Sequence, residues 1–329
     1  MADLRSGTGI GIALSSGGAA GVAHIGVLEE LRAAGIEIDC VAGTSAGTMV
    51  GGAFAADRLD EFHHRLISAA RRWVMTFFDP TWLGGGLFAG RRVMALLEPN
   101  MGESIEDLPR RFAAVATDLY SGREVVLRTG SVLDAVRASI AIPGIFTPIA
   151  RDGRLLVDGA LVDPIPVGVA RELGARFVIA VSVIPSAYAA ALVHACRHRW
   201  AGSGRLGRYW RILRWWRSPA GAKQDETFDV GASGEMTPRK LSIVLTRCSA
   251  VIQANIAAAR LRARPPDFLI QPQVDSIGVF DLERAAEAID AGREAARRAL
   301  PSLLAALDSD RRSVTRRILE SWTAAPAAA

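Results

Sequence analysis

Ser45 is the residue best placed for covalent chemistry, at the centre of the segment Gly-Thr-Ser-Ala-Gly. An apolar pair precedes this segment and small residues follow it, which is typical of a strand that turns sharply into a helix. Gly43 and Gly47 on either side let the strand and the helix approach closely, because no Cβ lies between them. The turn predicts an exposed Ser45 hydroxyl at a helix N-terminus, where backbone N–H groups stabilise negative charge. A tight turn without chemistry would carry the same motif.

A second glycine-rich stretch, which we name the glycine-rich loop, covers residues 15–21 between a predicted strand and a predicted helix. Such a loop presents free backbone N–H groups to an anion, either a phosphate or an oxyanion. A dinucleotide-binding fold makes the same shape, but its fuller fingerprint is Gly-x-Gly-x-x-Gly with an acidic residue about 20 positions later. Here Ser16 occupies the first position and the second predicted strand leads into the serine turn. The sequence therefore favours an oxyanion over a nucleotide.

A serine hydroxyl becomes a good nucleophile only when a base takes its proton. Asp158 ends a predicted strand and is followed by glycine. A triad in the order serine, acid, histidine would need a histidine after Asp158, and His194 and His198 both lie in an arginine-rich segment that we expect to be a surface attachment. The sequence therefore favours direct proton transfer from Ser45 to Asp158. The alternatives are His24 as the base, or a plain Asp-Gly turn at Asp158.

Predicted strands alternate with predicted helices along most of the chain. The strands are expected at 9–14, 40–42, 111–117, 124–128, 155–158, 177–183 and 268–270, and the helices at 22–34, 48–56, 59–78, 91–97, 131–140, 167–173, 241–261 and 281–300. A surface turn is expected at 83–88, a polar linker at 218–238 and a further helix at 311–322. This order predicts an α/β fold with a mostly parallel sheet, whose strand carboxyl ends bring the glycine-rich loop, Ser45 and Asp158 together.

In this order and at these spacings, the three motifs resemble the bacterial branch of the patatin-like phospholipases. The residues that carry the resemblance are 15–21, 43–47 and 158–160, with inner blocks at 116–119 and 138–146. The resemblance covers about residues 9–185, and residues 242–300 more loosely. It implies a three-layer α/β/α sandwich with a mostly parallel central sheet.

The same resemblance implies a catalytic dyad, with Ser45 as the nucleophile and Asp158 as the general base. It implies an oxyanion hole made by backbone N–H groups and supported by nearby glycines. The oxyanion residues would be Gly17, Gly18 and Ala19, and the supporting residues Gly21, Gly43, Gly47 and Gly159. The family hydrolyses acyl esters of phospholipids, lysophospholipids or related lipids through an acyl-enzyme, without a metal or another cofactor.

The chain departs from the family pattern at two positions of the glycine-rich loop. Ser16 stands where the family usually has a third glycine, and Ala20 where it usually has an arginine or lysine. These departures motivate a second interpretation, in which a protein of the same fold binds or scaffolds membrane lipid with weak or no catalysis.

Residues 194–217 form a basic aromatic insert that holds seven arginines and no acidic residue. As a helix, the segment would place most of its aromatic rings opposite its arginines, which suits the headgroup region of an anionic bilayer. The candidate membrane contacts are Trp210, Trp215, Trp216, Arg208, Arg211 and Arg214. A solvated arm or a partner-binding helix has the same composition. Nucleic-acid binding is not expected, and the spacing His194-x-Cys196-x-His198 is a weak metal signal.

Composition and length predict one large α/β domain with additions. The chain has 329 residues, half of them apolar, and a net charge of +5, which leaves −2 outside the basic aromatic insert (5 − 7). We expect an acyl hydrolase domain over 8–306, interrupted by the insert and linker at 191–240, and a C-terminal helix with a disordered tail at 307–329. Three scattered cysteines, no signal peptide and no apolar run of about 20 residues favour a cytoplasmic protein. The basic aromatic insert adds the expectation that the protein is peripheral on the inner membrane face. The oligomeric state is not specified.

Overall fold

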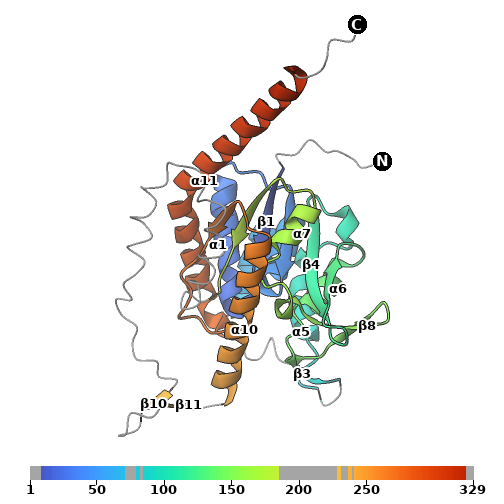
Figure 1. Ribbon diagram of the computed structural model, residues 1–329. Coiled ribbons are helices and arrows are strands. Elements are labelled where there is room, and N and C mark those ends of the chain that lie inside the picture. The colour runs from blue at the N-terminus through green and yellow to red at the C-terminus, as the bar shows by residue number, and fades with distance from the viewer. Residues whose placement is uncertain are drawn as a thin grey trace.

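The computed structural model describes residues 9–70, 79–81, 84–184, 228–230, 236–238 and 241–323. An eight-stranded sheet runs through its centre in the order β12-β9-β1-β2-β4-β8-β7, with β5 paired to β4 beside this path (Figure 1). The strands are β1 (Ile10–Leu14), β2 (Cys40–Thr44), β4 (Arg111–Asp118), β5 (Glu124–Leu127), β7 (Ile149–Arg151), β8 (Arg154–Asp158), β9 (Phe177–Val181) and β12 (Phe268–Ile270). The strands from β12 to β4 are parallel, whereas β5, β8 and β7 are antiparallel to their neighbours.

Helices cover both faces of this sheet, which confirms the predicted α/β/α arrangement. The helices are α1 (Ala23–Ala33), α2 (Ala46–Ala55), α3 (Leu59–Ala70), α5 (Arg91–Leu97), α6 (Val132–Ser139), α7 (Val167–Glu172), α10 (Leu241–Ala263) and α11 (Ala285–Thr323). Short 3-10 turns lie at η1 (Gly18–Val22), η2 (Glu98–Asn100), η3 (Ile105–Asp107), η4 (Gly159–Leu161) and η7 (Leu282–Arg284).

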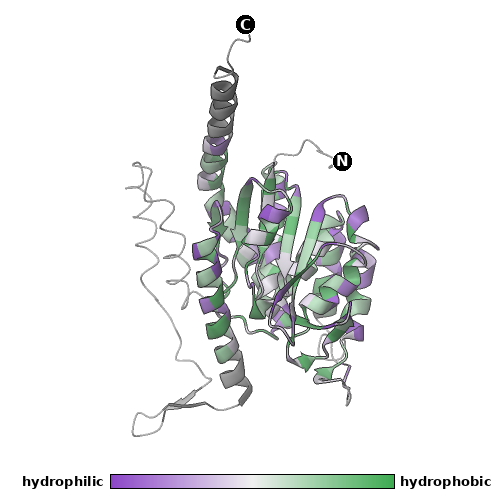
Figure 2. Cartoon of the chain, turned by 45° about the vertical axis from the view of Figure 1, so that its right-hand side comes forward, coloured by the Kyte–Doolittle hydropathy of each residue, from purple (hydrophilic) through white to green (hydrophobic). Residues whose placement is uncertain are grey.

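The central strands are apolar on both faces because each face packs against helices. Ile12 and Leu14 of β1 join the core under α1, α2, α3 and α11, whereas Ala13 joins the core under α7 and α10. In Figure 1, α1 and α11 lie side by side on one face. Figure 2 shows hydrophobic residues concentrated in the strands and hydrophilic residues on the outer helices and loops. Two cores thus fix the sheet, and with it the strand ends that lead to Ser45 and Asp158.

Three local predictions from the sequence were wrong. Part of the expected surface turn is a strand, β3 (Gly86–Phe88), which pairs with β6 (Gly144–Phe146). The expected polar linker contains β10 (Phe228–Val230), paired with β11 (Met236–Pro238). Pro301 does not separate two helices, because α11 continues through it. Leu303 and Leu307 beyond the proline are buried in the core, so packing outweighs the unfavourable proline.

The basic aromatic insert lies outside the described residues, and so do its candidate membrane contacts Trp210, Trp215, Trp216, Arg208, Arg211 and Arg214. Their role stays a prediction, as does the domain division at residue 307. Within the ranges that the structure describes, none of the helices combines the length and apolar character that crossing a bilayer requires.

Replacing Pro301 with alanine should stabilise the protein. The proline ring leaves one backbone carbonyl of α11 without its usual N–H donor, and a proline inside a helix costs up to about 3 kcal/mol relative to alanine. We expect Pro301→Ala to raise the free energy of unfolding by about 1–3 kcal/mol in urea titrations. Ser302→Ala is the matched control and should change it far less. A lower free energy of unfolding for Pro301→Ala would contradict this account.

Candidate active site

Ser45 lies in the turn between β2 and α2 with a strained backbone. Its φ of 54° and ψ of −121° belong to a region that costs a residue with a Cβ about 1–3 kcal/mol. The Ser45 N–H donates to Ser139 Oγ at 2.9 Å. That hydroxyl in turn donates to the Val115 carbonyl oxygen at 2.6 Å and lies 2.8 Å from Thr48 Oγ1. This buried hydrogen-bonded cluster ties the turn to α6 and β4 and holds the strained conformation.

The glycines around the turn lie where other segments pass too closely for a side chain. A Cβ at Gly47 would lie 2.3 Å from the carbonyl oxygen of Leu14, and one at Gly43 would lie 2.6 Å from that of Gly47. The other two predicted supporting glycines are equally crowded: Gly21 would meet Ala46 Cβ at 2.4 Å, and Gly159 the Val115 carbonyl oxygen at 2.2 Å. These contacts bring the glycine-rich loop, the serine turn and the Asp158 turn together.

Asp158 accepts a hydrogen bond from the nucleophile candidate. Ser45 Oγ donates to Asp158 Oδ2 at 2.7 Å, and the second carboxylate oxygen accepts the Ala160 N–H at 2.8 Å. The backbone of Asp158 is also held, because its N–H donates to the Ala141 carbonyl at 3.0 Å and its carbonyl accepts Thr117 Oγ1 at 2.8 Å. One carboxylate oxygen therefore accepts the serine hydroxyl, and the other accepts a backbone N–H of the turn that follows Asp158.

Convergence of Ser45 and Asp158 was predicted, but for a reason that does not hold for Asp158. That residue ends β8, which is antiparallel to β4, so the direction of its strand alone would not bring it to the carboxyl ends of the parallel strands. β8 is offset along β4 so that Asp158 lies opposite Ala116. Thr44, just before the serine, lies opposite Val115. The offset of one short strand thus brings the carboxylate to the level of the serine.

Burial makes Asp158 a stronger base than an ordinary carboxylate. Ser45 and Asp158 are only 5% and 4% exposed. Loss of hydration raises the pKa of Asp158 to about 6, although the hydrogen bonds from Ser45 and Ala160 act in the opposite direction. The group is therefore mostly ionised at neutral pH and still binds a proton readily, as a general base requires.

Two of the three residues predicted to form the oxyanion hole have N–H groups that are not used among the described residues. In the part of the chain that the structure describes, neither Gly17 nor Gly18 donates its N–H to a protein acceptor. The Ala19 N–H, in contrast, donates to the Val279 carbonyl oxygen at 2.9 Å. This bond occupies the N–H group, so Ala19 does not offer the oxyanion donor that the sequence predicted. Gly18 has φ +57°, and a Cβ there would lie 2.6 Å from that same carbonyl oxygen. Only glycine fits this position.

His24 does not contact the serine. Its Nε2 lies 2.9 Å from the Ser15 carbonyl oxygen, so it donates a hydrogen bond to the glycine-rich loop. Complete burial lowers the pKa of His24 to about 4. A neutral imidazole that is bonded elsewhere gives no support to the alternative of a histidine base.

Residues 12–171 match the family of patatin-like phospholipases. The chain belongs to the patatin-like phospholipase family. An uncharacterized NTE family protein of Mycobacterium tuberculosis is 43% identical over 175 residues, which cover 53% of this chain and 49% of the relative. A second one is 32% identical over 304 residues, or 91% of this chain and 48% of the relative. The neuropathy target esterase sws of Drosophila melanogaster is 32% identical over 190 residues, 56% of this chain and 13% of that protein. The chain therefore spans about half the length of the mycobacterial relatives.

Several contacts of this patatin-like site were not predicted. Ser139 and Thr117 lie in or beside the blocks that carry the family resemblance, and a hydroxyl among apolar neighbours was the available signal. Gln253, which accepts a hydrogen bond from Ser16 Oγ at 2.8 Å, had no signal in the sequence. Among the described residues, no group of three or more His, Cys, Asp or Glu side chains is arranged to hold a metal ion.

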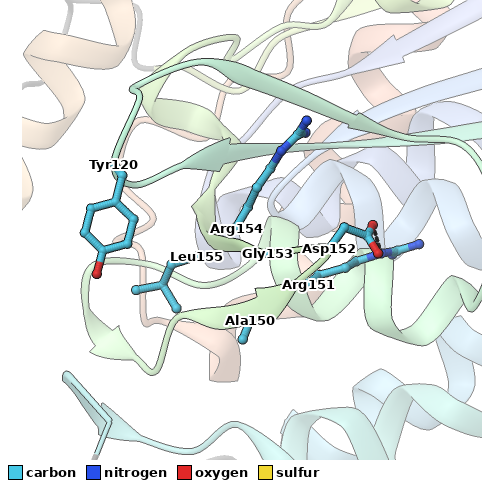
Figure 3. Close-up of a pocket in the computed structure, with 7 residues that line it drawn as sticks. All are labelled: Tyr120, Ala150, Arg151, Asp152, Gly153, Arg154 and Leu155. Carbon is cyan, nitrogen blue, oxygen red and sulfur yellow. Dashed lines mark ion pairs between the residues drawn. The ribbon is translucent and has the colours of Figure 1, made fainter.

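A surface pocket of about 400 Å³ lies at the β7–β8 hairpin of the patatin-like domain (Figure 3). Its lining residues are Tyr120, Ala150, Arg151, Asp152, Gly153, Arg154 and Leu155. None of the predicted site residues lines it, so this pocket is separate from the Ser45–Asp158 pair.

A second buried carboxyl group, Asp163, lies close to the strand that carries Ser45. Its carbonyl oxygen accepts Thr44 Oγ1 at 2.8 Å, while its side-chain Oδ1 has no partner among the described residues. Burial, followed by the charge of Glu124, raises the pKa of Asp163 to about 7. Asp163 makes no contact with Ser45 that would give it a part in proton transfer, which makes it a useful control for Asp158.

Both buried carboxyl groups should make the protein less stable as the pH rises. Each has a folded-state pKa above its unfolded value near 3.9, so folding takes up protons between that value and about 6 for Asp158 or about 7 for Asp163. The contribution of each raised pKa to the free energy of unfolding is fully present below about pH 3.9 and is lost as the pH rises through the folded-state pKa. We expect Asp158→Asn and Asp163→Asn each to raise the melting temperature at pH 8, with a smaller gain at pH 5. Lower melting temperatures at pH 8 for both variants would contradict the raised pKa values.

Proposed function

We propose that this protein is a serine acyl hydrolase that cleaves carboxylic esters of phospholipids, lysophospholipids or related lipids. The observation that carries the proposal is the 2.7 Å hydrogen bond from Ser45 Oγ to Asp158 Oδ2, made at a strained strand-to-helix turn. Membership of the patatin-like phospholipase family supports a lipid ester as the substrate class. One relative is named an esterase, which agrees with this reaction type.

In the proposed mechanism, the Asp158 carboxylate takes the proton of Ser45 Oγ as that oxygen attacks the acyl carbonyl carbon. The carbonyl oxygen becomes an oxyanion that accepts hydrogen bonds from the Gly17 and Gly18 N–H groups. The C–O bond to the alcohol then breaks, and Asp158 returns the proton to the leaving alkoxide. Water attacks the acyl-enzyme with Asp158 again as the base, which releases the fatty acid and restores Ser45.

The weak or non-catalytic interpretation keeps one specific observation in its favour. The Ala19 N–H is committed to Val279, which leaves two candidate donors in the glycine-rich loop instead of three. Losing one oxyanion donor typically lowers kcat by about 10²–10³-fold. A lipid-binding or scaffold protein with weak or no catalysis is therefore the alternative if Ser45 proves unreactive.

The first test is labelling of the purified protein with a fluorophosphonate, followed by mass spectrometry to locate the adduct. We expect an adduct on Ser45 that is absent in Ser45→Ala. Asp158→Asn should lower kcat for a short-chain soluble ester by about 10²–10⁴-fold, because general base catalysis is lost. Asp163→Asn, the matched control, should retain kcat. A folded wild-type protein without an adduct would refute the proposed nucleophile.

The pH dependence tests the base separately. Since Asp158 must be deprotonated to accept the serine proton, kcat/KM should rise with pH through about 6 and then level off. The same profile should appear in Asp163→Asn. A profile that is flat between pH 5 and 8 would exclude Asp158 as the titrating base.

We also propose that the basic aromatic insert binds an anionic membrane surface, with the enzyme at the cytoplasmic face. Deleting residues 194–217 should weaken sedimentation with vesicles that contain anionic lipid and leave hydrolysis of a soluble short-chain ester unchanged. Replacing Trp210, Trp215 and Trp216 with alanine, and separately Arg208, Arg211 and Arg214 with glutamine, should divide the apolar from the ionic contribution. Vesicle binding that survives the deletion would remove this role.

A further inference from the structure

The serine that replaces the usual first glycine of the glycine-rich loop is tied to a distant helix. Ser16 is 2% exposed, and its hydroxyl donates to Gln253 Oε1 of α10 at 2.8 Å. The Ser16 N–H donates to the Pro164 carbonyl oxygen at 2.9 Å. Glycine at this position could make the backbone bond but not the side-chain bond. The substitution therefore adds a link between the loop and α10.

The peptide unit that follows Ser16 is held in one orientation. Its carbonyl oxygen accepts Ser15 Oγ at 2.9 Å, and Ser15 Oγ itself accepts the Val183 N–H at 3.0 Å. In a trans peptide, the N–H of the next residue points opposite to the carbonyl. The Ser15 hydroxyl therefore sets the direction of the Gly17 N–H, one of the two proposed oxyanion donors.

The other end of the glycine-rich loop is fixed independently. The Ala19 N–H donates to the Val279 carbonyl oxygen at 2.9 Å, so the peptide between Gly18 and Ala19 is held against the loop before η7. Both proposed donors thus lie between two anchors. One anchor is the backbone bond at Ala19. The other is Ser16, which is held by its N–H on Pro164, by the Ser15 hydroxyl on its carbonyl oxygen and by its side-chain bond to Gln253.

A second hydrogen bond, within α10, fixes the orientation of the Gln253 side-chain amide. Its Nε2 donates to Ser249 Oγ at 2.9 Å, one turn earlier on α10, so its Oε1 is the end presented to the Ser16 hydroxyl. The next residue, Ala254, is buried in the core beneath α10, as are Ala257 and Leu261. A side chain locked on a packed helix is a firm support for a catalytic loop.

We infer that Gln253 is a positioning residue, which acts through Ser16 to hold the Gly17 and Gly18 N–H groups where the oxyanion forms. The inference rests on the proposed function and adds to it a role for α10. Oxyanion stabilisation depends on donors that are in place before the reaction, and a displacement of about 1 Å costs roughly 10²-fold in rate. Serine in place of glycine at position 16 thus restricts the loop through its hydrogen bond to Gln253, in addition to the restriction by the Ala19–Val279 bond.

A double-mutant cycle on the full chain tests this pair. We expect Gln253→Ala and Ser16→Gly each to lower kcat for a soluble short-chain ester by roughly ten- to a hundredfold, with KM changed less than about threefold. The double variant should be no slower than the slower single variant, because both changes remove the same hydrogen bond. Asn255→Ala is the matched control and should keep wild-type kcat, since the Asn255 side chain donates to the Val251 carbonyl oxygen of its own helix and not to the glycine-rich loop.

The outcomes separate this inference from the proposed function. Wild-type kcat in Gln253→Ala, or losses that multiply in the double variant, would overturn the positioning role while Ser45 remains active. If the wild-type protein neither hydrolyses esters nor labels at Ser45, the proposed function has failed. Amide hydrogen exchange over residues 15–22 then tests, without any activity, whether Gln253 holds the glycine-rich loop. Faster exchange in Gln253→Ala than in Asn255→Ala supports the positioning role of Gln253, and equal exchange overturns it.

Discussion

Close approach of backbones at the serine turn is the constraint on which the whole site depends. Gly47 passes the end of β1 where a Cβ would lie 2.3 Å from the Leu14 carbonyl oxygen, and Gly159 passes β4 just as closely. These approaches set the glycine-rich loop on one side of Ser45 and Asp158 on the other. The positive φ of Ser45 belongs to the same geometry, and the hydrogen bond of its N–H to Ser139 stabilises it. A larger residue at either glycine would separate segments that must meet.

Burial of Asp158 connects reactivity with stability. The carboxylate is more basic because water is excluded, and the same exclusion makes its ionised form unfavourable in the folded state. The two cores on either side of the sheet provide the free energy that offsets this cost. Asp163, whose carbonyl oxygen accepts the Thr44 hydroxyl, adds a second buried carboxyl group with a raised pKa near the serine turn. The fold thus accepts destabilising groups close to the site, as functional regions of proteins commonly do.

Residues beyond the matched family region, 12–171, complete the site. Val279 accepts the Ala19 N–H and packs against Gly18, and Gln253 accepts the Ser16 hydroxyl. Both come from the last third of the chain, which also supplies β12 and the long helix α11. The glycine-rich loop is therefore shaped from outside the segment that contains Ser45 and Asp158. Variation in these later residues would change the shape of the loop while the geometry of the Ser45–Asp158 pair stays the same.

The sequence by itself determined the alternation of strands and helices and the serine turn, because periodicity and glycine spacing are local signals. Its motifs also predicted the pairing of Ser45 with Asp158, but the strand arrangement that makes this pairing is not a local signal. The sequence did not determine that α11 passes through Pro301, since packing of residues beyond the proline decides that. Only the tertiary structure decided the antiparallel offset of β8, the commitment of the Ala19 N–H and the roles of Ser139 and Gln253. These depend on hydrogen bonds between residues far apart in the chain, 94 positions for Ser139 and 237 for Gln253, which no local pattern encodes. Burial, and with it the raised pKa of Asp158, likewise exists only once the cores have formed.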